Sequence, residues 1–221
     1  MKALAFDVYG TLIDTTGVTT TLHGMVGDQA MAFSTLWRAK QLEYTWRYGL
    51  MGVYRNFRIC TKQALDFSCE QLGCDLSDAE KKALMQKYLE LPVFDDVLDG
   101  LERLKSANVA MYAFSNGVPD DLTQLLTHAQ IIDFMDGIVS VDVNKTFKPN
   151  PLVYQQFVEV AGTAPRKSWL VSSNGFDVCG AVAAGMRAVW LQRSAAVCFD
   201  HWEFEPDKVV TTFDEMTDLF V

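Results

Sequence analysis

Several ingredients that define whole classes of protein are scarce in this sequence. Its three histidines are scattered, at His23, His128 and His201, and its five cysteines show no paired Cys-x-x-Cys spacing. A transition-metal site therefore has almost no ligands to use. The cysteines are odd in number, and we expect them to be reduced thiols. A Gly-x-Ser-x-Gly segment is also missing, which disfavours a serine hydrolase of that kind.

Positive charge and long apolar runs are scarce as well. The 221 residues include 28 acidic and 19 basic side chains, for a formal net charge of -9, which disfavours nucleic acid and anionic membranes as partners. No apolar run approaches the ~20 residues of a membrane-spanning helix. The segment before Asp7 is too short for the apolar region of a signal peptide. We therefore expect a cytoplasmic protein that binds neither nucleic acid nor membrane.

Apolar sequence is abundant, at 49% of the residues, which is enough for one large domain or a domain with a substantial insertion. From residue 96 onward, segments of strand length alternate with helical segments. After a first strand that ends at Asp7, strands are predicted at about 109–114, 137–140, 168–171 and 188–191. Helices are predicted at about 97–106, 119–129, 151–161, 178–184 and 213–220. This alternation predicts an α/β fold with a doubly wound, Rossmann-like parallel sheet.

Residues 15 to 95 have a different character, because helical periodicity replaces the alternation of strand and helix. One long helix is predicted from Ala30 to Phe57 on an apolar stripe formed by Ala39, Leu42, Trp46, Leu50, Val53 and Phe57. A second helix fits residues 62–72, and a third begins with a capping box at Ser77 and Glu80 and runs to about Leu91. We expect a core of residues 1–14 and 96–221 with an inserted helical cap of residues 15–95.

The most informative segment is the first strand and its end, Phe6-Asp7-Val8-Tyr9-Gly10-Thr11-Leu12. The apolar run before Asp7 is typical of a strand covered on both faces of a parallel sheet. A carboxylate at the end of such a strand faces the crevice where open α/β sheets bind ligands. Burying a carboxylate is costly unless it is paired, which indicates a functional Asp7. A turn-forming aspartate is the alternative.

Four segments, in order, resemble the four motifs of the haloacid dehalogenase superfamily. They are Phe6–Leu12, Phe114–Gly117, Lys148–Pro149 and Ser172–Asp177. Each closes an apolar strand or opens a helix, and together they are far more specific than any one alone. The resemblance implies that Asp7, Ser115, Lys148 and Ser172 converge at one edge of the sheet, beneath the cap.

The sequence departs from the phosphatases of that superfamily at two positions. They carry aspartate two residues after the nucleophile and in the fourth motif, whereas this chain has Tyr9 and Ser173. These departures resemble the L-2-haloacid dehalogenase branch. The segment from Leu36 to Trp46 resembles the first cap helix of that branch, with Arg38 as the matching arginine. The resemblance covers essentially the whole chain and implies an enzyme without metal or other cofactor.

The same resemblance implies a reaction and a set of roles. Asp7 would attack C2 of an (S)-2-haloacid, expel halide and form an aspartyl ester that water hydrolyses to an (R)-2-hydroxyacid. The implied catalytic group is Asp7, Thr11, Lys148, Tyr154, Ser172, Asn174 and Asp177. The implied residues around the 2-haloalkanoate and the halide ion are Val8, Tyr9, Arg38, Leu42, Phe57, Ser115, Asn116 and Phe176.

Ordinary structural explanations remain open for several of these residues. Arg38 could be a solvated charge on a long helix and Lys148 a surface lysine before a proline turn. Asp177 could be an N-cap for a helix beginning at residue 178, and Tyr154 a core residue whose hydroxyl reaches the surface. Core packing is the ordinary explanation for Leu42, Phe57 and Phe176.

Three further points stay open from sequence. Ala39 replaces a glutamine of the family pattern, which puts the halide pocket and the substrate preference in question. A magnesium phosphatase with an unusual site, or a non-catalytic binding protein on the same fold, are the alternative functions. A homodimer is expected, because aromatic residues surround more than one face of the long cap helix. They are Trp37, Tyr44, Trp46, Tyr48 and Tyr54.

Overall fold

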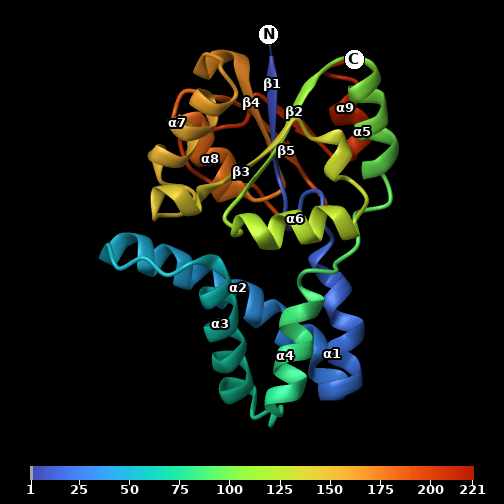
Figure 1. Cartoon of the computed structure of the whole chain (residues 1–221), viewed down its shortest axis with the longest axis vertical. Coiled ribbons are helices and arrows are strands. Elements are labelled where there is room, and N and C mark those ends of the chain that lie inside the picture. Colours follow the sequence, from blue (N-terminus) through green and yellow to red (C-terminus); the bar gives the residue numbers. More distant parts are fainter. Residues whose placement is uncertain (1) are drawn as a thin grey trace.

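A computed structural model describes residues 2–221 and contains one six-stranded parallel sheet (Figure 1). The strand order is β3-β2-β1-β4-β5-β6. The strands are β1 (Ala3–Asp7), β2 (Ala110–Ser115), β3 (Gly137–Ser140), β4 (Ser168–Ser172), β5 (Arg187–Leu191) and β6 (Lys208–Val210). The first five confirm the sequence prediction to within a residue or two. The edge strand β6 was not predicted, because it is short and two of its three residues are exposed.

β1 lies in the middle of the sheet, and all five of its residues are buried. Four of them are apolar, and the fifth, Asp7, is paired with Lys148. Ala3 pairs with Ala110 of β2 on one side and with Ser168 of β4 on the other. The register places Asp7 opposite Phe114, near the ends of both strands. Parallel pairing therefore brings the carboxyl ends of β1, β2 and β4 to one edge of the sheet.

Helices cover the sheet on both sides, as a doubly wound fold requires. Figure 1 shows α7 and α8 on one side and α5 and α9 on the other. The five helices of this part are α5 (Val97–Ser106), α6 (Pro119–His128), α7 (Pro151–Val160), α8 (Gly175–Ala183) and α9 (Phe213–Thr217). All five were predicted, although α8 begins at Gly175 rather than at residue 178. The fold class predicted from sequence is confirmed.

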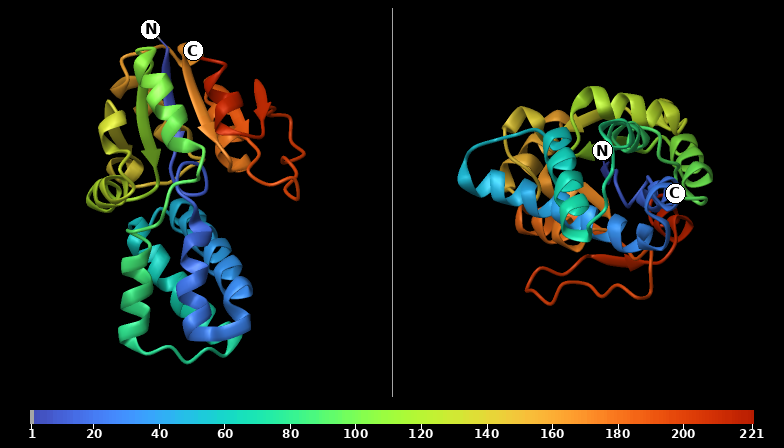
Figure 2. Two further views of the ribbon diagram at one scale, coloured as in Figure 1. Left: turned by 90° about the vertical axis from the view of Figure 1, so that its right-hand side faces the viewer. Right: turned by 90° about the horizontal axis from the view of Figure 1, so that it is seen from below.

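Four helices form a separate group beneath the edge at which the strands end (Figure 2). They are α1 (Thr19–Val26), α2 (Ala30–Met51), α3 (Phe57–Leu72) and α4 (Asp78–Lys87), and we call them the helical unit. α1 was not predicted. The capping box that opens α4 is confirmed, since Ser77 and Glu80 exchange their side-chain and backbone hydrogen bonds. The helix ends at Lys87 rather than Leu91.

The prediction of one helix from Ala30 to Phe57 is wrong. α2 ends at Met51, because Gly52 adopts the left-handed conformation, with φ 67°, that closes a helix. α3 then begins at Phe57 rather than at residue 62. Its N-cap is Asn56, whose Oδ1 accepts a hydrogen bond from the Ile59 amide at 3.0 Å. Phe57 therefore reaches the site from α3 and not from the end of α2.

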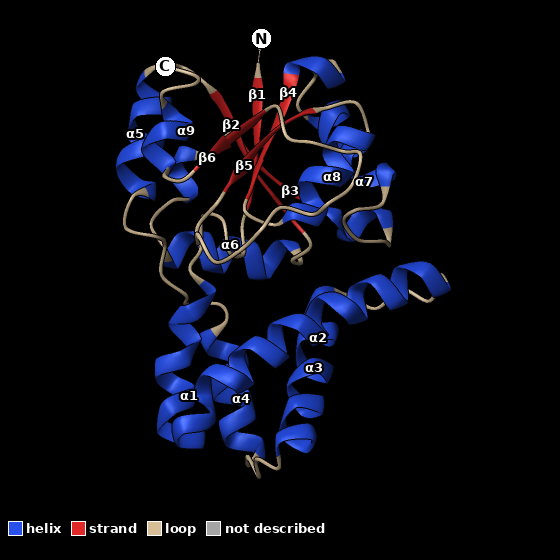
Figure 3. Cartoon of the chain, turned by 180° about the vertical axis from the view of Figure 1, so that it is seen from behind, coloured by secondary structure: helices blue, strands red, loops and turns tan. Residues whose placement is uncertain are grey.

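The apolar stripe predicted on α2 is also wrong. The buried residues of this helix are Ala30, Phe33, Trp37, Gln41 and Thr45. The last turns of α2 project from the helical unit beneath α7 and α8, and Leu50 there is 89% exposed (Figures 1 and 3). The buried face includes two polar residues, so apolar spacing placed it incorrectly. Gln41 hydrogen bonds to Thr61 of α3, and Thr45 donates to the Leu42 carbonyl of α2 itself. Trp37, expected among exposed aromatic residues, is fully buried.

Two chain crossings connect the sheet to the helical unit, and they are bonded to each other. The Asp14 amide donates to the Pro92 carbonyl at 2.8 Å, and the Phe94 amide donates to the Leu12 carbonyl at 3.1 Å. Arg193, which follows β5, donates two 2.7 Å hydrogen bonds to Asp96 and one of 2.9 Å to the Thr11 carbonyl. One guanidinium thus ties both crossings to the sheet.

All five cysteines are free thiols, as predicted. Across residues 2–221, no helix has both the length and the apolar character needed to cross a membrane.

The contact between α5 and α9 gives a test of the packing. A Cβ added to Gly100 would lie 2.8 Å from Thr217 Oγ1 and still closer to the Phe213 ring. Because both neighbours are buried, we expect Gly100→Ala to lower the free energy of unfolding by about 1–3 kcal/mol. Gly24 on α1 has open space around it, so Gly24→Ala is the matched control and should stabilise by up to ~1 kcal/mol. Denaturant unfolding measures both, and equal effects would contradict the packing described.

Candidate active site

Asp7 ends β1 with a carboxylate that is 7% exposed and accepts three hydrogen bonds. Thr11 Oγ1 and Asn174 Nδ2 donate to its Oδ2 at 2.8 and 2.7 Å. Lys148 Nζ donates to its Oδ1 at 3.1 Å. These donors fix the direction of both oxygens. The turn-forming interpretation of Asp7 does not account for these contacts with distant residues.

Thr11 returns to Asp7 because the chain turns sharply directly after β1. Gly10 has a φ of 87°, and its amide donates to the Ile13 carbonyl at 2.8 Å. This backbone region favours glycine. The Thr11 hydroxyl oxygen also accepts a hydrogen bond from the Ser173 amide at 2.9 Å. In its other hydrogen bond Asp7 Oδ2 is the acceptor, so the hydroxyl hydrogen points at Asp7.

Lys148 is 1% exposed, so the surface-lysine interpretation is wrong. Its ammonium donates to Asp7, to the Phe114 carbonyl at 2.8 Å and to Asp177 Oδ2 at 2.8 Å. These three acceptors use all three of its donors. Asn116 Oδ1 accepts from the Lys148 amide at 3.0 Å and so holds the backbone of this loop. A buried cation is tolerated here because every donor is paired.

Asp177 is fully buried on α8, with Lys148 on one oxygen and Tyr154 on the other. The Tyr154 hydroxyl donates to Asp177 Oδ1 at 2.8 Å. Burial raises the pKa of Asp177 to about 6, although the Lys148 ammonium acts in the opposite direction. The N-cap interpretation of Asp177 is wrong, because Asn174 is the N-cap of α8. The Tyr154 hydroxyl does not reach the surface, since the residue is fully buried.

Ser115 and Ser172 lie at the ends of β2 and β4, and both shape the loop that follows their strand. Ser115 Oγ accepts from the Gly117 amide at 3.1 Å, and Ser172 Oγ accepts from the Asn174 amide at 3.1 Å. The Ser172 bond holds the loop from which Asn174 reaches Asp7. The two serines therefore contact loop backbone rather than the Asp7 carboxylate.

Arg38 extends from α2 toward the loop after β1, so the solvated-charge interpretation is wrong. Its Nη2 donates to the Tyr9 carbonyl at 3.4 Å, and its Nη1 donates to Gln41 Oε1 at 2.7 Å. Asn116 was expected beside Arg38 at the halide. Within the described residues the Asn116 carbonyl oxygen is instead bonded to the Lys148 amide. Ala39 is exposed on α2 and lines neither of the two cavities described next.

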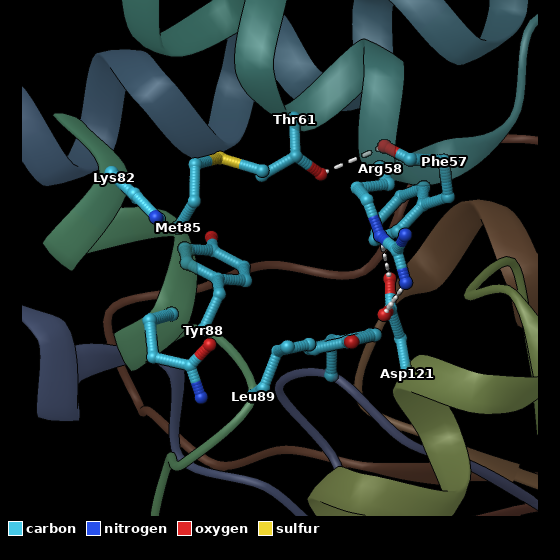
Figure 4. Close-up of a pocket in the computed structure, with 10 residues that line it drawn as sticks. Phe57, Arg58, Thr61, Lys82, Met85, Tyr88, Leu89 and Asp121 are labelled. Carbon is cyan, nitrogen blue, oxygen red and sulfur yellow. Dashed lines mark hydrogen bonds and ion pairs between the residues drawn. The ribbon is translucent and has the colours of Figure 1, made fainter. Parts of the chain in front are cut away.

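Two cavities border the site, one lined by Tyr9 and the other by Lys148 and Asn174. The smaller, of ≈ 330 Å³, is lined by Tyr9 and Phe57, whose rings lie 5.5 Å apart, and by residues of α3, α4 and α6 (Figure 4). At its edge Arg58 of α3 points at Asp121 of α6, and the two form an ion pair. Burial raises the pKa of the Tyr9 hydroxyl above its usual range, so the group stays neutral.

The larger cavity, of ≈ 770 Å³, is lined by Leu42 and Phe176 together with Lys148 and Asn174. Phe176 contacts Trp46 edge-on, with ring centroids 5.3 Å apart. Leu42, Phe57 and Phe176 were expected to form one apolar wall. The structure instead divides them, with Phe57 at the smaller cavity and the other two at the larger.

Sequence reasoning missed the residues that connect the helical unit to the site. Gln41 and Thr61 hold Arg38, the pair Arg58 and Asp121 joins α3 to α6, and Arg193 holds the Thr11 carbonyl. None of the four motifs contains these side chains. Gln41 lies one turn after Arg38 within the segment Leu36–Trp46, and that position was the available signal.

The positions at which phosphatases carry further aspartates are occupied by uncharged side chains. Tyr9 packs against Phe57, and Ser173 Oγ is buried without a hydrogen-bond partner. Within residues 2–221, no three His, Cys, Asp or Glu side chains gather closely enough to hold a metal ion.

Comparison with known proteins agrees with this geometry. Residues 1–185 match the family model for haloacid dehalogenase-like hydrolase. An (S)-2-haloacid dehalogenase of Pseudomonas sp. (strain YL) is 37% identical, over 100% of this chain and 94% of that protein. Haloacetate dehalogenase H-2 of Moraxella sp. (strain B) is 32% identical, over 99% of this chain and 97% of that protein.

A solved structure gives the same result in three dimensions. It is L-2-haloacid dehalogenase from Xanthobacter autotrophicus with chloropropionic acid covalently bound. It has a TM-score of 0.93 and 31% identity, over 99% of this chain and 98% of that chain. The fold and the buried aspartate, lysine and aspartate group thus define a hydrolase of the haloacid dehalogenase-like class. Within that class, the chain belongs to the (S)-2-haloacid dehalogenase family, whose members align with its whole length.

The raised pKa of Asp177 gives a test of its role. Below about pH 6 the buried side chain is protonated and loses its ionic contact with Lys148, and above it the carboxylate is restored. We therefore expect kcat/KM for haloacid turnover to rise with pH through an apparent pKa of about 6. In Asp177→Asn, whatever turnover remains should lack this acid limb. Asp66→Asn, on the exposed side of α3, is the control and should keep it. An unchanged limb in Asp177→Asn would assign the titration to another group.

Proposed function

We propose that this chain hydrolyses (S)-2-haloacids to (R)-2-hydroxyacids through a covalent aspartyl ester on Asp7. An Asp7 oxygen forms a bond to C2 while the carbon–halogen bond breaks, and the halide leaves with the bonding electrons. Water then attacks the Asp7 carboxyl carbon, which releases the hydroxyacid and returns the carboxylate. The observation that carries the proposal is the buried Asp7 carboxylate, held by Lys148, Thr11 and Asn174 at the strand edge facing the helical unit.

Attack on C2 depends chiefly on positioning. Holding a carboxylate against a reacting carbon accounts for about 7–11 kcal/mol of a barrier through effective molarity. Lys148, Thr11 and Asn174 all donate to the Asp7 carboxylate and fix its orientation. Val8 and Tyr9, directly after Asp7, would present backbone amides to the substrate carboxylate. In this arrangement the substrate lies beneath the end of β1, between Arg38 and the sheet.

Charge explains the need for Arg38. The substrate and the departing halide are both anions, and a protein with a formal net charge of -9 must offer them a local positive site. We assign the halide to Arg38 with the Asn116 amide group, and the apolar part of the substrate to Leu42 and Phe176, which line the same cavity as Lys148 and Asn174. Phe57 lines the other cavity and supports the site by packing against Tyr9. Ser115 supports the site through its loop.

The second step requires an ordered water near the Asp7 carboxyl carbon. We assign the deprotonation of this water to Asp177, whose carboxylate is held by Tyr154 and Lys148. Ser172 and Asn174 hold the loop beside it. The pKa of Asp177, raised to about 6 by burial, leaves it able to accept a proton from water at neutral pH.

The two alternative functions fit the geometry less well. A phosphatase needs an acid where the neutral Tyr9 lies, packed against Phe57. A binding protein without catalysis has no use for a nucleophile held by three donors, or for a second buried carboxylate on the same lysine. Both carboxylates are costly to bury. The proposed reaction uses both, Asp7 to attack C2 and Asp177 to accept a proton from water.

We further propose that residues 15–95 act as a cap over a core of residues 1–14 and 96–221. Besides the contact of Arg38, two polar contacts away from the chain crossings also join these parts. They are the ion pair of Arg58 with Asp121 and the 2.6 Å hydrogen bond from the Tyr54 hydroxyl to Asp142. Such contacts hold the helical unit over the strand edge, which excludes bulk water from Asp7.

The covalent route gives a direct test. Chloride should be released from (S)-2-chloropropionate and not from its enantiomer, and EDTA should leave the rate unchanged. In a single turnover in oxygen-18 water, the label should enter Asp7, because the aspartyl carbon receives the water oxygen. Mass spectrometry of the peptide containing Asp7 detects the oxygen-18 label. Labelling of the first hydroxyacid instead would show that water attacks C2. Magnesium-dependent turnover of p-nitrophenyl phosphate without dehalogenation would favour the phosphatase.

A second test concerns the guanidinium on α2. Arg38→Lys keeps the charge but loses the planar fork that can bind two acceptors at once. We expect a folded protein that loses roughly 10²-fold or more of kcat/KM, as when an aligned charge donor is removed from a site. Arg47→Lys, at an exposed position on the same helix where the arginine pairs with Glu43, is the matched control and should be neutral. Near-normal chloride release by Arg38→Lys would remove Arg38 from the site.

Assembly gives a third test. The end of α2 exposes Trp46, Leu50, Met51 and Val53, the last three by half or more of their surfaces. Exposed apolar patches of this size favour a partner surface, and we propose a homodimer through this end of α2. Light scattering at micromolar concentrations should give twice the chain mass, and Leu50→Glu should shift it to the monomer. A monomer mass for the wild-type protein would refute the dimer.

A further inference from the structure

Gln41 is a polar residue whose burial the reaction above does not explain. It is fully buried on α2, one turn after Arg38. Its Oε1 accepts from Arg38 Nη1 at 2.7 Å, and its Nε2 donates to Thr61 Oγ1 of α3 at 2.6 Å. Enclosing an amide is costly unless its polar atoms are bonded, and both ends of this one are.

The direction of these hydrogen bonds follows from the groups themselves. A guanidinium only donates, so the Gln41 oxygen must face Arg38 and its NH₂ group must face Thr61. The Thr61 hydroxyl donates its hydrogen to the Phe57 carbonyl at 2.8 Å, which leaves its oxygen to accept from Gln41 (Figure 4). The Thr61 carbonyl also accepts from the Trp37 indole at 2.8 Å. The chain from Arg38 therefore ends on backbone that packing already fixes.

Gln41 makes the closer of the two hydrogen bonds of Arg38. The other, to the Tyr9 carbonyl, is 3.4 Å long. Arg38 and Gln41 are three residues apart, which places them on the same face of the helix. The amide thus determines which way the guanidinium plane faces.

We propose that Gln41 is the positioning residue for Arg38, and that Thr61 holds Gln41 in turn. This inference rests on the proposed function, in which Arg38 receives the halide. A neutral acceptor orients the guanidinium and leaves its full charge for the anion. A carboxylate at the same place would pair with Arg38 and compete with the halide. An amide therefore suits this position better than an acid.

The first measurement compares two glutamines that both join α2 to α3. Gln41→Leu removes both polar contacts at similar volume, and kcat should fall by about tenfold or more with a smaller change in KM, because charge on the halide develops in the transition state. Gln63→Leu is the matched control. Gln63 is exposed and accepts from the Tyr48 hydroxyl of α2 at 3.0 Å, and it does not touch Arg38. It should leave kcat unchanged. Equal effects of the two variants would overturn the proposal.

A double-mutant cycle separates positioning from general packing. If Gln41 acts through Arg38, Gln41→Leu should cost less than about threefold in an Arg38→Lys background, because coupled residues are not additive. The same loss in both backgrounds would show that Gln41 only stabilises the helices. Gln41→Glu should also lower kcat while the protein stays folded. The glutamate keeps the acceptor for Arg38, but its negative charge pairs with the guanidinium and competes with the halide. Full activity of Gln41→Glu would count against the proposal.

Thr61 provides a second test, which remains usable if Gln41→Leu fails to fold. Thr61→Val removes the hydroxyl at constant shape and should lower kcat, whereas Thr61→Ser should restore it. Unfolding midpoints measured alongside show whether any loss follows stability instead. Wild-type chloride release tests the proposed function separately. Should it be absent, calorimetric titration with sodium bromide still tests the positioning, because Gln41→Leu should weaken halide binding and Gln63→Leu should not. Equal binding by both variants would overturn the inference.

Discussion

The ammonium group of Lys148 is the charge on which the rest of the structure depends. It is 1% exposed and is bonded to Asp7 of β1, Asp177 of α8 and the Phe114 carbonyl of β2. Removing one partner from such a group leaves a charge buried without compensation, which is strongly destabilising. Two carboxylates that would repel each other are instead held on one cation. The proposed nucleophile, Asp7, and the residue assigned to its hydrolytic water, Asp177, are therefore both held in place by the same ammonium group.

The sheet makes this arrangement possible, and the helical unit completes it. Because β1, β2 and β4 run parallel, their ends and loops bring Asp7, Asn116 and Asn174 to one edge. That edge provides a rigid anionic centre in which the Lys148 ammonium already has three acceptors. Arg38 comes from α2 and is held there by Gln41. Rigid positioning of the nucleophile and delivery of a positive charge are thus divided between two parts of the chain, joined by crossings that Arg193 clamps.

Most of the α/β part could be predicted, because buried parallel strands and amphipathic helices leave clear patterns. The helical unit could not be predicted to the same extent. α2 buries Gln41 and Thr45 and exposes Leu50, so apolar spacing pointed to the wrong face. The end of α2 was also missed, because it is set by the left-handed backbone conformation of Gly52 and not by the spacing of apolar residues. The edge strand β6 leaves too short and too exposed a segment to recognise.

The sequence by itself determined the fold class and the family and pointed to Asp7 as the candidate nucleophile, because the four motifs carry that information in local order. The tertiary structure decided which alternatives held at Lys148, Asp177 and Tyr154, since burial depends on residues far apart in the chain. It also decided how Arg38 is aimed. The chain of hydrogen bonds through Gln41 and Thr61 joins two helices whose packing no single segment encodes. Motifs are local, whereas burial and long-range hydrogen bonding exist only once the chain has folded.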